Sequence, residues 1–162
     1  MTLDNVIRNA CLSLLVIMIS ACGFSLRGSY QLPVQLQEIK FKQANNQFHK
    51  EIAKYLKSAK VIVSNKTGIP KLMVSQIEEA RTILSVGSAG NPQEYELTAT
   101  ATVSIPETQN GIFLPPKKLI VRRDYVYEST GVLNANGQEI QLKIEMEKEL
   151  ARKVMQALQA VQ

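Results

Sequence analysis

The stretch EYELTATATVSI, residues 94–105, decides the fold. Its odd positions are apolar, and its even positions hold glutamate, threonine or serine. Because successive side chains of a strand project to opposite faces, this alternation predicts a long strand with one buried and one solvated face. A sheet built on it needs a covering layer on one side only, which favours a two-layer fold. The apolar positions are Tyr95, Leu97, Ala99, Ala101, Val103 and Ile105.

The segments on either side of this stretch also have the pattern of strands. From Lys71 to Val86, Leu72 and Val74 share one face before the apolar phase shifts, so we expect a long strand with a bulge or twist near Gln76. A further strand is expected over about 117–128, after a loop rich in proline and glycine. Short turns would let these three strands form an antiparallel meander.

The sequence pattern of the first part of the domain predicts a strand, a helix and a second strand. Residues 48–59 have apolar side chains at three- and four-residue spacing, with Asn45-Asn46 in place to cap a short amphipathic helix. Strands are expected near 36–42 and at 61–63, joined by a right-handed parallel crossover.

The chain ends with a longer amphipathic pattern. Residues 134–137, Asn-Ala-Asn-Gly, predict a loop and helix start, and a helix is expected from about 140 to 161. The predicted fold is therefore α+β, a two-layer sandwich. A mixed sheet of about four to five strands carries two helices on one face, within a single domain at 35–162.

The first 22 residues predict secretion. The apolar run at 10–19 is shorter than the ~20 residues of a membrane-spanning helix, but it fits the core of a signal peptide. Ile19-Ser20-Ala21-Cys22 then resembles the bacterial lipobox, in which the cysteine thiol takes a diacylglycerol and the chain is cleaved before it. We expect a lipoprotein signal peptide at 1–21 and a lipidated tether at 22–34. An ordinary secretory signal with an incidental cysteine is the alternative.

Lipidation of Cys22 would fix the location. Several long acyl chains on one residue hold a protein at a bilayer almost permanently. Similarity to bacterial lipoproteins adds that Gly23 is not the aspartate that commonly signals retention at the inner membrane. We therefore expect a lipid-anchored protein at the periplasmic face of the outer membrane.

The chain has 162 residues and a net charge of +5. It contains few side chains of the types that commonly act in catalysis. His49 is the single histidine, and we expect it to be a surface residue facing solvent. Cys11 would leave with the signal peptide and Cys22 would be acylated, so neither cysteine offers a free thiol. Glu94 and Glu96 are expected on the solvated face, where nothing raises the pKa of a carboxyl. We predict no enzyme, no metal site, and no cofactor apart from the covalent lipid.

The expected last strand carries a basic cluster, namely Lys117, Lys118, Arg122 and Arg123. Period two places Lys118 and Arg122 on one face and Arg123 on the other. Such cations can hold phosphate groups by charge-assisted hydrogen bonds, and phosphorylated lipid A is the polyanion of an outer membrane. Nucleic acid is not an expected ligand of a secreted lipoprotein. The alternative is that these cations only keep an exposed strand soluble.

The motif Cys22-Gly23-Phe24-Ser25-Leu26-Arg27-Gly28 resembles the mature N-terminus of the LptE family of lipopolysaccharide (LPS) assembly lipoproteins. Glu94-Tyr95-Glu96-Leu97, Val121-x-Arg123-x-Tyr125, Val132-Leu133 and a Glu-rich C-terminal helix follow in the family's order. The resemblance implies a small, non-enzymatic domain inside or against the β-barrel of a partner, LptD. Together the two would insert LPS into the outer leaflet, and the lipoprotein would help the barrel to assemble.

The resemblance also implies LPS binding through basic residues in loops at one end of the sheet. The corresponding turns here, 85–91 and 133–137, contain no lysine or arginine. This difference moves the expected LPS site to Lys117, Lys118, Arg122 and Arg123. The alternative function is that of an accessory lipoprotein of another envelope β-barrel or machine, without an LPS ligand.

Overall fold

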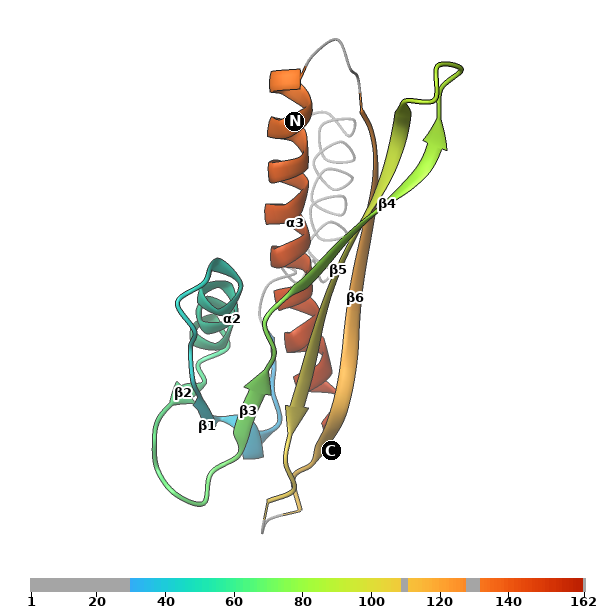
Figure 1. Cartoon of the computed structure of the whole chain (residues 1–162). Coiled ribbons are helices and arrows are strands. Elements are labelled where there is room, and N and C mark those ends of the chain that lie inside the picture. The colour runs from blue at the N-terminus through green and yellow to red at the C-terminus, as the bar shows by residue number, and fades with distance from the viewer. Residues whose placement is uncertain (1–29, 109–110, 128–131, 162) are drawn as a thin grey trace, which may run out of the picture.

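The computed structural model describes residues 30–108, 111–127 and 132–161 (Figure 1). The expected signal peptide and the tether up to residue 29, with Cys22, lie outside these ranges. Neither described helix combines the length and the hydrophobicity that a bilayer-spanning segment needs. The elements are the 3-10 helix η1 (Val34–Leu36), β1 (Glu38–Phe41), α2 (Gln47–Ser58), β2 (Ile62–Val63), β3 (Lys71–Val74), β4 (Glu78–Val86), β5 (Pro92–Ile105), β6 (Leu114–Val126) and α3 (Val132–Gln159).

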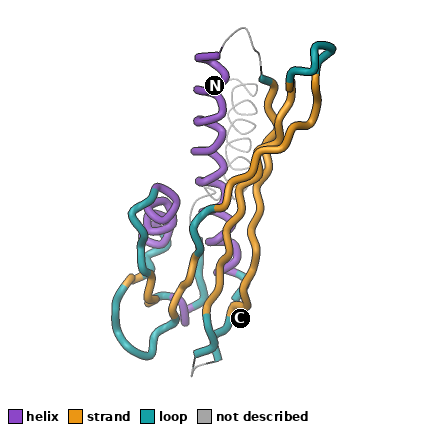
Figure 2. Tube along the Cα trace, viewed as in Figure 1, coloured by secondary structure: helices purple, strands orange, loops and turns teal. Residues whose placement is uncertain are grey.

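Strand β5 organises the sheet. It pairs antiparallel with β6 from Glu94 opposite Val126 to Ile105 opposite Leu114. Its other edge is shared by β3 and β4, which are both antiparallel to it. β1 pairs in parallel with both β3 and β2. The predicted mixed sheet with a helical second layer is confirmed, and β3 and β4 lie end to end along one edge of β5 (Figure 2).

The break between β3 and β4 falls where the sequence predicts a bulge. The N–H of Ser75 donates to the carbonyl of Thr102 (2.9 Å), and the N–H of Thr102 donates to the hydroxyl oxygen of Ser75 (3.0 Å). A side-chain oxygen thus takes the place of a backbone acceptor in the ladder. The strand is interrupted here without leaving the amide of Thr102 unpaired.

Helix α2 has a defined cap at each end. The side chain of Asn46 accepts a hydrogen bond from the N–H of His49 (2.8 Å), as the sequence predicts for an N-cap. At the other end, Lys60 takes the left-handed conformation with φ 60°. Its N–H and that of Val61 each donate to carbonyls of the last turn at 3.0 Å. Glycine is the usual residue at this position of a helix end, because a side chain there is strained.

His49 corrects one prediction, because it is buried rather than exposed to solvent, with 3% of its surface accessible. Its Nδ1 lies 3.0 Å from Oδ1 of Asn46, and its Nε2 lies 3.4 Å from the carbonyl oxygen of Val74. Polar atoms with partners can be buried at modest cost. The spacing to Ile52 and Leu56, three and seven residues on, places His49 on the apolar stripe of α2 and could have revealed its burial.

Helix α3 begins at Val132, several residues before its expected start, so the expected loop at 134–137 is helical. Glycine costs about 1 kcal/mol relative to alanine inside a helix, and asparagine costs less. Propagating an existing helix by one turn is easy compared with nucleating a new one, so a long helix tolerates these residues.

The dry core lies at one end of the molecule. The buried apolar cluster continues along β5 and β6 as far as Leu97 and Tyr125, but its largest fully buried side chains gather where α2, the C-terminal half of α3, β1 and the end of β5 meet. The largest fully buried side chains are Phe48, Leu36, Ile39, Ile52, Leu56, Ile105, Met146, Leu150, Met155, Leu158, Val103 and Val154. None of these comes from β4 or from residues 137–145, the part of the N-terminal half of α3 whose side chains are described.

Candidate functional site

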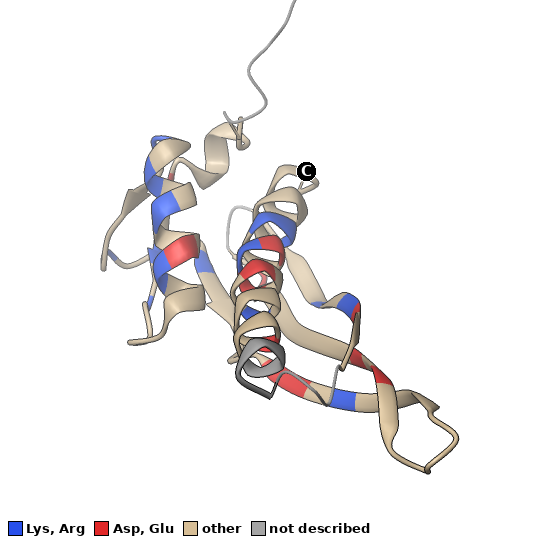
Figure 3. Cartoon of the chain, turned by 90° about the horizontal axis from the view of Figure 1, so that it is seen from above, with Lys and Arg blue, Asp and Glu red and all other residues tan. Residues whose placement is uncertain are grey.

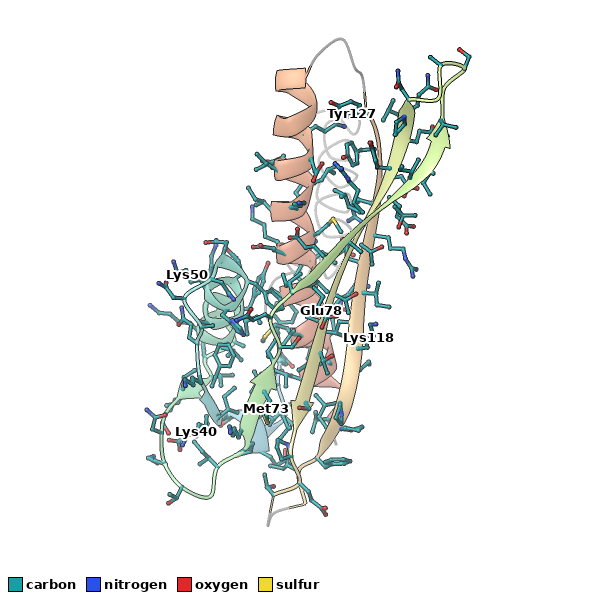
Figure 4. The ribbon with its side chains drawn as sticks, in the orientation of Figure 1. Lys40, Lys50, Met73, Glu78, Lys118 and Tyr127 are labelled. Carbon is teal, nitrogen blue, oxygen red and sulfur yellow. The ribbon has the colours of Figure 1, made fainter. Side chains whose placement is uncertain are left out.

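The face of the sheet turned away from α3 is mainly polar along three strands, with Ile120 and Val126 of β6 among its apolar residues, and we call it the open face. Apolar odd-numbered residues of β5 are buried on the opposite side, so the even-numbered residues point outward. Figure 4 labels Glu78 on β4 and Lys118 on β6, the two outer strands of this part of the sheet. Its polar residues include Glu78, Thr82, Glu96, Thr98, Thr100, Thr102, Lys118, Arg122 and Asp124.

Lys118 and Arg122 both lie on the open face. They stand opposite Thr102 and Thr98 of β5, respectively. Four residues of strand separate their backbones by about 13 Å, so a single phosphate group could contact both only if the two side chains extended toward each other. Arg122 Nε lies 3.8 Å from Oε1 of Glu96, at the limit of an ion pair, while Lys118 has no ion pair within the described part of the chain. The open face therefore offers two separate cationic donors.

The other two predicted cations lie on the helix side of β6. The guanidinium of Arg123 forms an ion pair with Glu149 of α3. Lys117 stands opposite Val103 near the start of β6, with its side chain exposed. The structure thus places Lys118 and Arg122 on the open face and Lys117 and Arg123 on the other face, as the alternation predicts. Arg123 instead ties the sheet to α3.

A cluster of polar side chains, which we call the Glu139 cluster, joins the N-terminal half of α3 to the sheet. The hydroxyl of Tyr125 donates to Oε2 of Glu139 (2.6 Å), and NH1 of Arg81 lies 3.3 Å from the same oxygen. Lys143 Nζ lies 3.1 Å from both Glu139 Oε1 and Glu79 Oε2. Only the pair Glu139 and Lys143, four residues apart, is visible in the sequence, because the other partners come from β4 and β6.

The pKa values within the Glu139 cluster shift together. The hydrogen bond from Tyr125 holds the pKa of Glu139 below its ordinary value. Burial raises the pKa of the Tyr125 hydroxyl, and the hydrogen bond to Glu139 raises the pKa of Lys143. Each shift favours the form that makes these contacts, namely carboxylate, neutral phenol and ammonium. The cluster is a structural tie between two layers.

The β4–β5 hairpin ends in an uncharged tip, which the sequence reading did not single out. From Thr82 to Gln93 there is no charged residue. Ile83, Leu84 and Val86 are each at least half exposed, and the pairing of β4 with β5 shifts register here. Such irregular pairing at a strand end discourages the addition of a further strand.

In the described ranges, no three side chains of His, Cys, Asp or Glu are placed to hold a metal ion together. The open face offers hydrogen-bond donors and acceptors that can bind a ligand or partner, and the Glu139 cluster offers ion pairs that hold α3 to the sheet.

Comparison with known proteins assigns the family. The family model LptE, described as lipopolysaccharide-assembly, matches residues 34–158. The LPS-assembly lipoprotein LptE of Pectobacterium atrosepticum is 26% identical over 152 residues, which covers 91% of this chain and 82% of that protein.

Solved structures show the same fold. Rare lipoprotein B from Shewanella oneidensis superposes with a TM-score of 0.65 at 23% identity, covering 74% of this chain and 92% of its own. Lipoprotein B from Nitrosomonas europaea gives a TM-score of 0.67 at 18% identity, with coverages of 85% and 91%. The family match extends from η1 into the last turn of α3. This chain belongs to the LptE lipopolysaccharide-assembly family.

Proposed function

We propose that this chain is an outer-membrane lipoprotein, held at the periplasmic face by acyl chains on Cys22, which partners an LptD-type β-barrel in assembling LPS. It acts as a plug and assembly factor and catalyses no reaction. The observation that carries the proposal is the family match over residues 34–158. The Pectobacterium relative, which is named an LPS-assembly lipoprotein, supports the same role.

The polar character of the open face supports the proposal that the domain lies inside the β-barrel. Thr98, Thr100 and Thr102 form a row of hydroxyls along β5, flanked by charged residues of β4 and β6. The lumen of a large outer-membrane barrel is polar, so a polar sheet face can lie against its wall without an apolar interface. The 14 residues of β5 extend about 46 Å, more than the ~25 Å apolar band of such a barrel.

A short tether supports lasting association with a barrel in the same membrane. Cys22 precedes Tyr30 by eight residues, which span at most about 29 Å when extended. An acyl anchor on Cys22 would keep the domain within that distance of the bilayer. Confinement of this kind raises the effective concentration of a membrane partner without any new contact.

We further propose that Lys118 and Arg122 bind phosphate groups of LPS. Both are exposed on the same face, and arginine retains free donors beside its long contact with Glu96. The acidic residues Glu78, Glu96 and Asp124 share this face. Phosphate groups would therefore be attracted to the two cations themselves rather than to the open face as a whole.

Co-purification under mild detergent tests the partnership. A stable one-to-one complex with an outer-membrane β-barrel of the LptD type is the expected result. Recovery of the chain alone, or with a different envelope machine, would instead support the accessory-lipoprotein alternative. Cys22→Ala should leave the precursor unprocessed, and normal maturation of that variant would refute the lipobox assignment.

Substitution tests the LPS site. The double variant Lys118→Ala/Arg122→Ala should bind LPS more weakly than the parent protein. Lys148→Ala/Lys153→Ala removes two cations from α3 and serves as the matched control, because its net charge is identical. Equal LPS binding by both double variants would leave the strand cations with a role in solubility only.

A further inference from the structure

The positive charge of the chain is concentrated in one unit. Residues 30–71, from the entry of the tether to the start of β3, contain eight lysines and two glutamates, a net charge of +6. Residues 72–162 contain nine basic and eleven acidic residues, a net charge of −2. A field of one sign over a small unit favours binding to a surface of the opposite sign.

Helix α2 presents much of this charge on one side. Lys50, Lys54 and Lys57 follow each other at four and three residues, so they share a helix face, and all three are exposed. Lys60 continues the row just past the helix end and is also exposed. We call these four residues the lysine stripe. Figure 3 shows the basic segments along α2, and Figure 4 shows Lys50 on the side of α2 away from α3.

The lysine stripe has little neutralising charge. Glu51, the single acidic residue of α2, is largely buried and accepts a hydrogen bond from the Gln47 amide (3.1 Å). Its other oxygen lies 3.8 Å from Nζ of Lys54, whose side chain is 76% exposed. The other three lysines of the stripe make no ion pair in the described ranges. Elsewhere in the described ranges, Arg81, Arg122, Arg123 and Lys143 form ion pairs, whereas Lys117, Lys118, Lys148, Arg152 and Lys153 do not.

The stripe also lies beside the segment that leads to the acyl anchor. The ring of Tyr30 packs edge-on against Tyr55 of α2, with centroids 5.6 Å apart. Tyr30 and Lys60 both line an open groove of about 590 Å³ at the end of α2. Tyr30 lies eight positions after Cys22, so an acylated Cys22 would keep Tyr30, and with it the part of α2 that Tyr30 contacts, within about 29 Å of the bilayer.

We propose that the lysine stripe docks α2 onto the headgroups of anionic phospholipids in the leaflet that holds the anchor. This docking rests on the proposed acylation of Cys22. Lipid anchors commonly act together with a basic patch, because each lysine near an anionic surface adds attraction. The open face, with Lys118 on β6, is turned away from α3, against which α2 packs, so docking of α2 leaves this face available to a partner.

Lysine footprinting on vesicles tests the docking. The acylated protein is reconstituted into vesicles of phosphatidylcholine, alone or mixed with phosphatidylglycerol, and lysine acetylation is read by mass spectrometry. Labelling of Lys50, Lys54 and Lys57 should fall at least about threefold in the mixed vesicles. Lys117 and Lys118 should be labelled equally in both. At about 1 M salt, where the Debye length is ~3 Å, the protection should disappear.

Two triple variants that lose the same charge distinguish an effect of the lysine stripe from an effect of the net charge. In Lys50→Gln/Lys54→Gln/Lys57→Gln, the remaining stripe residue Lys60 should lose its protection. The matched triple variant Lys117→Gln/Lys118→Gln/Lys148→Gln should keep Lys60 protected, and unchanged thermal unfolding of both would show that each still folds.

Three results would overturn the docking. Equal labelling in both vesicle types would show that the anionic headgroups do not contact the stripe. Protection by phosphatidylcholine vesicles carrying LPS, but not by phosphatidylglycerol, would assign the stripe to LPS phosphates. Failure of the chain to float with any vesicle would refute the acylation of Cys22, and the docking with it, which is distinguishable from the first two results.

Discussion

The two halves of α3 are held to the rest of the domain by different forces. The C-terminal half inserts Leu150, Val154 and Leu158 into the dry core, where each is fully buried. The N-terminal half leaves Ile140 largely exposed and is tied to the sheet by the Glu139 cluster. Beyond this half, the hairpin tip exposes further apolar residues.

This difference concentrates stability at one end. Burial of apolar area contributes about 25 cal/mol per Å² and needs no exact geometry. Partly exposed ion pairs contribute about 0–1 kcal/mol each and are weakened by salt. The half held by the Glu139 cluster should therefore open locally more often than the half around the dry core, while the whole domain stays folded.

The largest effect is expected in the dry core. Leu150→Ala should lower the free energy of unfolding by about 2–5 kcal/mol, because it removes a fully buried side chain and leaves a cavity. Urea denaturation of the purified protein measures this change, with Ile140→Ala as the exposed control on the same helix. A loss below about 1 kcal/mol would contradict the contrast between the two halves.

A smaller effect is expected from Glu139→Gln. The change keeps the shape of the side chain but removes the charge that Arg81, Tyr125 and Lys143 contact. Because Glu139 is one-fifth exposed and solvent screens its contacts, the expected loss is about 1 kcal/mol. Hydrogen exchange should quicken in β4 and stay unchanged at 150–158. Faster exchange in both segments would mean that the two halves form one cooperative unit.

The contribution of Glu139 should also depend on pH. Its pKa is lowered in the folded protein, first by the hydrogen bond from Tyr125, so its stabilisation is fully present above the unfolded pKa of about 4.3. The stabilisation is lost as the pH falls through the folded pKa. The stability difference between the parent protein and Glu139→Gln should therefore be constant near neutral pH and shrink below about pH 4. A constant difference down to pH 3 would argue against an ionised Glu139.

A gain of about 0.5 kcal/mol is expected from Lys60→Gly. The left-handed conformation of Lys60 is strained by about 1 kcal/mol, and glycine relieves it at the cost of a more flexible unfolded chain. Thermal unfolding would show a higher melting temperature, with Lys60→Ala as the control that keeps a Cβ. Lys60 lies at the end of α2, which contributes side chains to the dry core. The substitution would therefore further stabilise the end of the molecule that is already the more stable one.

The smallest effect is expected from Glu147→Gln in the middle of α3. Burial raises the pKa of Glu147, and the charges of Glu79 and Glu51 raise it further, while Oε2 has no hydrogen-bond partner among the described residues. A raised pKa means that the folded protein favours the protonated form, so the group costs stability at neutral pH and the cost fades as the pH falls. The substitution should add a few tenths of a kcal/mol at pH 7 and nothing at pH 4. A loss of stability at pH 7 would show that the carboxylate has a favourable partner.

The sequence predicts the elements well because their signals are local. The alternation at 94–105 defines β5, Asn46 marks the start of α2, and the phase shift near Gln76 marks the break between β3 and β4. The contacts between α3 and the sheet leave no pattern in the local sequence. The partner of Arg123 is Glu149, and the partners of Glu139 come from two strands, so only the folded chain reveals which cations are already paired. Of the predicted basic cluster, Arg123 is paired with Glu149, Lys117 lies on the helix side of β6, and Lys118 and Arg122 lie on the open face.

The way in which β3 and β4 share one edge of β5 imposes an order on folding. The meander of β4, β5 and β6 joins neighbours in the chain, so it closes short loops and can form early. β1 forms its contacts over longer separations, because its sheet neighbours β2 and β3 lie about 24 and 31 residues downstream and β3 itself pairs with β5. In a chain that crosses a membrane N-terminus first, β1 would wait for later segments, and pulse-labelled hydrogen exchange should find its amides protected after those of β5 and β6.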